Sequence, residues 1–149
     1  MKKELINFYN SLNTKTKNNY DENIAIDFNF VDGAYVLLKN AEEEYKVDFI
    51  NRNTNDIIFS TKLSNNMWAR SSIRYYIDYK IVISRVSDDK VVFEHNISLK
   101  NKKVHINFES KSLGDTLAWI PYVEEFRKKH NCELVVSTFL NNMFQKTYP

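Results

Sequence analysis

The sequence predicts a β-rich antiparallel module followed by the first strand–helix–strand unit of a doubly wound α/β domain. Apolar residues alternate with a period of two through most of residues 24–97. From residue 104 the pattern changes to a strand, a glycine-containing turn, an amphipathic helix and a second strand. Two parallel strands and one helix do not close a core, so residues 102–149 are expected to be the start of a longer, truncated domain.

The first module is predicted over residues 23–101 as an antiparallel sandwich or barrel, and residues 1–22 as an N-terminal segment or linker. Asp32-Gly33 lies between two apolar runs and predicts a hairpin. Polar turn sequences separate the later runs. Six strands are expected, the longest being the fifth, at residues 24–30, 34–38, 45–49, 57–63, 75–83 and 91–97.

The predicted helix follows Gly114. Leucines 113 and 117 with Ile120, Val123 and Phe126 recur mainly every three or four residues, which predicts one apolar face. Pro121 is expected to kink the helix and Asn131 to end it. Residues 134–136 are continuously apolar, as in a strand covered on both faces.

Composition excludes several classes of function. The net charge of +2 offers no basic field for nucleic acid. Cys132 is the single cysteine, and the three histidines lack the spacing of metal ligands, so no metal site is predicted. Neither a signal peptide nor a membrane-spanning run is recognisable, so we expect a cytoplasmic protein without membrane insertion.

The strand-to-helix turn ESKSLGDT carries the candidate chemistry, because ligands of doubly wound sheets bind beyond the carboxyl ends of the strands. Asp115 is the candidate base, placed to accept a proton from an attacking hydroxyl. Gly114 allows close backbone approach, and Ser112 and Thr116 complete the predicted substrate-binding turn. The alternative is that Asp115 only caps the helix, with Ser112 beside it.

Trp68 is the upstream candidate for substrate binding. It is either a platform on which a sugar stacks or an aromatic plug that closes one end of the sandwich. His95 alternates with core-facing positions and is expected to be packed or at the rim of the core.

The run SKSLGDTLAWIPYVEEFRKKHNCELVVSTFLNNMF resembles the start of the catalytic domain of bacterial heptosyltransferases, through Gly114, Asp115 and Pro121. With YKVDFINRNTNDIIFSTKLSNNMWAR upstream, the closer resemblance is to autotransporter O-heptosyltransferases, from about residue 45 onward.

The resemblance implies a GT-B fold of two Rossmann-like halves, with residues 102–149 beginning the first half. It also implies a nucleotide-sugar donor such as ADP-heptose, an acceptor serine on an autotransporter-like protein, and homo-oligomers. Asp115 would match the general base of the family. The family's iron site uses four cysteines and is not supported by Cys132 alone. Because no second Rossmann unit follows, this chain alone is expected to be inactive. The alternative function is a non-catalytic β-sandwich module for binding or oligomerisation.

Overall fold

The computed structural model describes residues 23–144 and 146–147, so the predicted N-terminal segment 1–22 lies outside the described residues. The chain divides into two compact units, Met1–Ile97 and Ser98–Pro149. We call them the sandwich unit and the βαβ unit, and each is described by itself.

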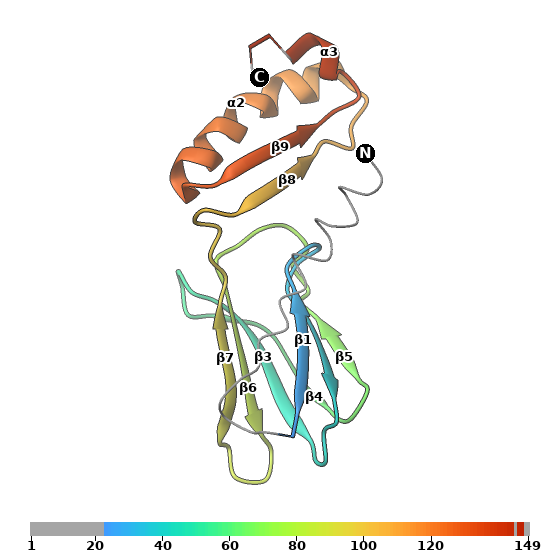
Figure 1. Cartoon of the computed structure of the whole chain (residues 1–149), viewed down its shortest axis with the longest axis vertical. Helices are drawn as coiled ribbons and strands as arrows, with labels where there is room; N and C mark the ends of the chain where they lie inside the picture. Colours follow the sequence, from blue (N-terminus) through green and yellow to red (C-terminus); the bar gives the residue numbers. More distant parts are fainter. Residues whose placement is uncertain (1–22, 145, 148–149) are drawn as a thin grey trace. The chain divides into compact units, whose positions relative to one another are not determined.

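The sandwich unit consists of two antiparallel sheets (Figure 1). Their strand orders are β1-β2-β5 and β4-β3-β6-β7. The prediction of an antiparallel β-rich module is confirmed. The strands are β1 (Ala25–Asn29), β2 (Tyr35–Lys39), β3 (Tyr45–Asn51), β4 (Ile57–Leu63), β5 (Trp68–Arg70), β6 (Tyr79–Arg85) and β7 (Val91–Asn96).

The core of this unit lies between the two sheets. The Phe28 ring of β1 is 5.3 Å from the Phe93 ring and 4.5 Å from the His95 ring, both on β7. His95 is therefore packed among rings, as predicted, and burial lowers its pKa. Each fully buried large apolar side chain contributes about 1.5–3 kcal/mol. Alternate residues of the strands supply the buried set, which includes Ile26, Phe28, Val36, Leu38, Val47, Phe49, Ile81, Ile83 and Phe93.

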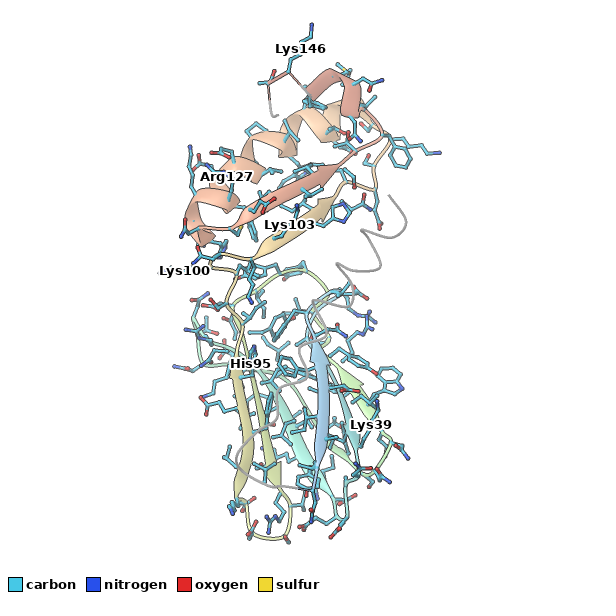
Figure 2. All side chains as sticks on the ribbon, viewed as in Figure 1. Lys39, His95, Lys100, Lys103, Arg127 and Lys146 are labelled. Carbon is cyan, nitrogen blue, oxygen red and sulfur yellow. The ribbon has the colours of Figure 1, made fainter. Side chains whose placement is uncertain are left out.

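The predicted hairpin is present, since β1 pairs with β2 through Ile26↔Leu38 and Phe28↔Val36. Lys39 of β2, labelled in Figure 2, also pairs with Asp27 of β1, with 2.6 Å between Nζ and Oδ2. Gly33 in the connection has a φ of 73°. A Cβ atom there would lie 2.3 Å from the Ile73 carbonyl oxygen. Glycine is thus required both by backbone conformation and by space.

A buried hydrogen-bond network lies against this glycine. The Ser71 hydroxyl accepts the Ala34 N–H at 3.0 Å and donates to the Ile73 carbonyl at 2.6 Å. The Tyr79 hydroxyl donates to the same carbonyl at 2.7 Å. Burial is the largest cause that raises the pKa of Tyr79. The network holds residues 71–79 in place as the chain leaves one sheet and enters the other.

The predicted strand at residues 75–83 is wrong at its start, because the chain passes from one sheet to the other there. The observed strand β6 begins only at Tyr79, and Tyr75 is 71% exposed. Sequence reasoning also missed the short strand β5, Trp68–Arg70. Because β5 and β6 belong to different sheets, the residues between them leave the extended conformation, although their apolar alternation continues.

The βαβ unit contains β8 (Lys103–Asn107), α2 (Leu113–His130), β9 (Glu133–Ser137) and α3 (Asn141–Phe144) (Figure 1). β8 and β9 pair in parallel, with Val104 opposite Leu134, as predicted. The helix runs through Pro121 and ends at Asn131, whose left-handed φ of 48° confirms the predicted stop.

The buried face of α2 differs from the prediction. Thr116, Ile120 and Val123 are buried, whereas Leu117 is 50% exposed and Leu113 is exposed as well. Val135 in β9 is 42% exposed, so the expectation that this strand is covered on both faces is wrong for the described residues. The described part of the unit offers one long helix to the two strands, which covers one face only.

Candidate functional site

The candidate site begins where β8 gives way to α2. Ser112 is the N-cap residue, with extended backbone (φ −70°, ψ 126°), and its hydroxyl accepts the Asp115 N–H at 3.3 Å. The Thr116 hydroxyl donates to the Ser112 carbonyl at 3.0 Å and is buried. Ser112 therefore caps the helix, and the alternative that Asp115 is the cap is wrong.

The side chain of Asp115 is held by a different serine. The Ser110 hydroxyl donates to Asp115 Oδ2 at 2.6 Å and accepts the Ser112 N–H at 3.1 Å. The carboxylate is exposed and lies on the first turn of α2. It is thus oriented by a neighbouring hydroxyl while remaining accessible to a ligand.

A hollow of about 340 Å³ opens beside this carboxylate. It lies at the carboxyl end of β8 and the start of α2, which is where ligands bind in doubly wound sheets. Of the predicted site residues, Asp115 and Thr116 line it, while Ser112, the N-cap, and Gly114, in the first turn of α2, do not. The lining residues are Asn107, Phe108, Glu109, Ser110, Asp115, Thr116 and Trp119.

Sequence reasoning missed Ser110, Glu109 and Trp119 as site residues. Trp119 is 59% exposed and contacts the Tyr122 ring at 5.8 Å. It follows Asp115 by four residues, a spacing that places two side chains on the same helix face. The four-residue spacing of Asp115 and Trp119 was therefore visible in the sequence. The prediction followed instead the helix face that carries Leu113 and Leu117.

Trp68 lies in the sandwich unit and does not line this hollow. It is 60% exposed on β5 and stacks on Tyr35 at 5.8 Å. The prediction that it plugs one end of the sandwich is wrong for that reason. Arg70, on the same strand, lies 5.3 Å from the centre of the Tyr35 ring. A stacking role for Trp68 stays a prediction.

Several other ionisable groups of the βαβ unit have structural partners or are buried. Arg127, labelled in Figure 2, donates two hydrogen bonds of 2.7 Å to Glu124 and lowers the pKa of that carboxyl. The His105 ring bonds the Ser137 hydroxyl at 2.8 Å across the strand pair. Cys132 is buried, which raises the pKa of its thiol. Within residues 23–144 and 146–147, no three His, Cys, Asp or Glu side chains form a group able to hold a metal ion.

No helix in the described ranges has the length and apolar character needed to span a membrane.

An antiparallel sandwich joined to a parallel strand–helix–strand unit, with a carboxylate at the strand-to-helix turn, is similar to the N-terminal part of a solved glycosyltransferase, TibC. Residues 23–87 match the family model of the glycosyltransferase TibC N-terminal domain. The resemblance to autotransporter heptosyltransferases is thereby confirmed, and it extends over most of the chain.

The individual relatives agree. The autotransporter heptosyltransferase BAHTCr of Citrobacter rodentium is 34% identical over 90% of this chain. The autotransporter heptosyltransferase TibC of Escherichia coli O78:H11 is 32% identical over 86%. A crystal structure of TibC from enterotoxigenic E. coli matches 91% of this chain and 36% of its own, with a TM-score of 0.71 at 30% identity. The chain spans about a third of the length of the curated relatives, 32% and 31%.

Proposed function

We propose that the protein carrying this chain transfers a heptose from a nucleotide-activated donor, such as ADP-heptose, to a serine hydroxyl of an autotransporter-like protein. The observation that carries this proposal is the exposed Asp115 carboxylate beside a hollow at the carboxyl end of β8. The relatives support the sugar, because they are heptosyltransferases and one TibC structure is a complex with ADP-D-β-D-heptose.

In this proposal, residues 102–149 begin a GT-B catalytic domain and residues 23–101 form an accessory β module. The parallel pair β8–β9 with α2 is the arrangement that opens such a domain. Leu117 and Val135, exposed in this chain, would then be covered by the rest of the domain. The donor would bind chiefly to residues beyond this chain, so the chain alone would be inactive.

The proposed chemistry is a direct transfer of the sugar to the acceptor oxygen, in which Asp115 acts as the general base. The acceptor serine oxygen forms a bond to the anomeric carbon, and its proton passes to the Asp115 carboxylate. The bond from the anomeric carbon to the diphosphate breaks, and its electron pair leaves with the nucleoside diphosphate. Trp119 would offer an apolar surface beside the reacting hydroxyl. The backbone of Ser112 and Gly114 would form the turn that carries Asp115.

The iron of the relative TibC is not carried over to this chain, whereas oligomeric assembly is proposed for it. TibC is iron-containing and dodecameric. The described residues of this chain do not form a metal site, and buried Cys132 lacks companion cysteines, so no step of the proposed reaction is routed through iron. We propose a homo-oligomer that acts in the cytoplasm, which size-exclusion chromatography with light scattering and cell fractionation would test.

The decisive experiment is Asp115→Asn in the full-length protein, assayed with ADP-heptose and an autotransporter acceptor by intact mass spectrometry. Transfer should fall by at least about 10²-fold, the usual contribution of a general base. Glu125→Gln is the matched control, because Glu125 is an exposed carboxylate on the same helix. Retained turnover in Asp115→Asn, with an unchanged circular dichroism spectrum, would remove Asp115 as the base.

The alternative is a non-catalytic binding or oligomerisation module. It is favoured by the similarity to BimC of Burkholderia thailandensis, an inactive autotransporter heptosyltransferase that is 28% identical over 116 residues. The exposed Trp68 of β5 would be the contact residue. Saturable binding of acceptor peptide that is lost in Trp68→Ala, together with no sugar transfer by the full-length protein, would establish it.

A further inference from the structure

Ser110 makes two hydrogen bonds that link the backbone of the turn to the side chain of Asp115. Its hydroxyl oxygen accepts the Ser112 N–H at 3.1 Å, in the geometry of a serine turn. Its hydroxyl proton is donated to Asp115 Oδ2 at 2.6 Å. The oxygen is therefore fixed by the backbone, and the proton is directed at one carboxylate oxygen.

The two oxygens of Asp115 consequently differ. Oδ2 accepts the Ser110 hydroxyl, while Oδ1 has no hydrogen-bond partner among the residues that the structure describes. Ser112 holds the backbone N–H of Asp115 at 3.3 Å, so backbone and side chain are held by separate serines. A carboxylate restrained in this way offers one particular oxygen to a ligand in the hollow.

We infer that Ser110 is a positioning residue for sugar transfer, holding Asp115 so that Oδ1 takes the acceptor proton. This inference rests on the proposed function of Asp115 as base. A general base must lie within about 2.6–3.2 Å of the proton-bearing oxygen. Loss of the Ser110 hydroxyl frees the Asp115 side chain to rotate about its own bonds, and fewer encounters then have productive geometry.

If Ser110 only stabilised the fold, its loss would lower the unfolding midpoint, which is not expected here. Ser112 caps the helix without help from the Ser110 proton, and because Ser112 is an exposed residue, water can replace the acceptor that its N–H would lose. Ser110→Ala is therefore expected to leave the unfolding midpoint nearly unchanged while it affects transfer.

The test compares Ser110→Ala, Ser110→Thr and Ser87→Ala in the full-length protein. Ser87 is the matched control, because its hydroxyl donates to Glu43 Oε2, also at 2.6 Å, in the sandwich unit. Ser110→Ala should lower kcat by about 10- to 100-fold with an acceptor KM within about twofold. Ser110→Thr, which keeps the hydroxyl, should restore most of kcat, and Ser87→Ala should match the parent.

A parental kcat in Ser110→Ala would overturn the inference, as would a loss that threonine does not restore. Asp115→Asn, measured in parallel, separates the two claims. If Asp115→Asn is inactive while Ser110→Ala is fully active, the base stands and the positioning role falls. If Asp115→Asn stays active, both fall. Side-chain three-bond couplings of Asp115 provide a readout without catalysis, and should report one rotamer in the parent chain and averaging in Ser110→Ala.

Discussion

Gly33→Ala is the substitution whose cost the structure states most sharply. The new methyl carbon would lie 2.3 Å from the Ile73 carbonyl oxygen and 2.5 Å from Ser71 Oγ. At a φ of 73° an alanine also bears the left-handed strain of about 1–2 kcal/mol. Displacing the Ser71 hydroxyl from the buried network breaks at least one hydrogen bond, which adds about 1–2 kcal/mol. The expected loss of stability is about 3 kcal/mol.

Urea unfolding followed by tryptophan fluorescence measures this loss. The chain has two tryptophans, one in each unit, so a Trp119→Phe background leaves Trp68 to report on the sandwich unit. With a urea dependence of about 1 kcal/mol per molar for a unit of this size, the midpoint should fall by about 3 M. If the unit is then unfolded without urea, the loss of the fluorescence transition itself reports the effect.

Two further variants separate the causes. Gly33→Asn relieves most of the φ strain, because asparagine tolerates left-handed backbone, but it keeps the clashing Cβ. It should remain destabilised by at least about 1 kcal/mol. Gly114→Ala, measured through Trp119 in a Trp68→Phe background, is the matched control. Among the described residues outside its own stretch of helix backbone, only Ser112 Oγ would lie within 4 Å of the Cβ, at 3.7 Å, and alanine should stabilise the helix slightly. A Gly33→Asn midpoint equal to that of the parent would refute the steric argument.

Three other outcomes follow from buried groups. Burial lowers the pKa of His95 below its ordinary 6.5, so between those two pKa values the unfolded chain binds more protons than the folded chain. The sandwich unit should therefore lose stability as the pH falls through about 6.5, by at most about 1.4 kcal/mol per pH unit, and His95→Gln should flatten this dependence in urea titrations at several pH values. Tyr79→Phe leaves the Ile73 carbonyl without one donor and should cost about 1–2 kcal/mol in urea unfolding, whereas Tyr75→Phe, at an exposed ring, should change stability by less than about 0.5 kcal/mol. Because burial shields the Cys132 thiol and raises its pKa, Ellman's reagent should label it slowly in the native chain and rapidly in denaturant; equal rates would contradict its buried position.

Local chemistry explains why much of the fold was predictable. The Asp32-Gly33 turn predicted the β1–β2 hairpin, because the turn conformation depends on adjacent residues. Asn131 predicted the end of α2, because a left-handed cap favours asparagine. Trp68 shows the limit of such reasoning, since the same residue is compatible with a buried plug and with the exposed β5 position that it occupies.

The succession of most strands and of the helix, and the place of Asp115 at the strand-to-helix turn, were determined by the sequence itself through periodicity and turn residues that act over a few positions, whereas β5 and the start of β6 were not. Contacts through space decided the rest. Which face of α2 is buried depends on the strands that it covers, and Thr116 is buried where Leu117 was expected. The bond from Ser110 to Asp115 likewise depends on how the turn folds back on the helix, which no spacing rule describes.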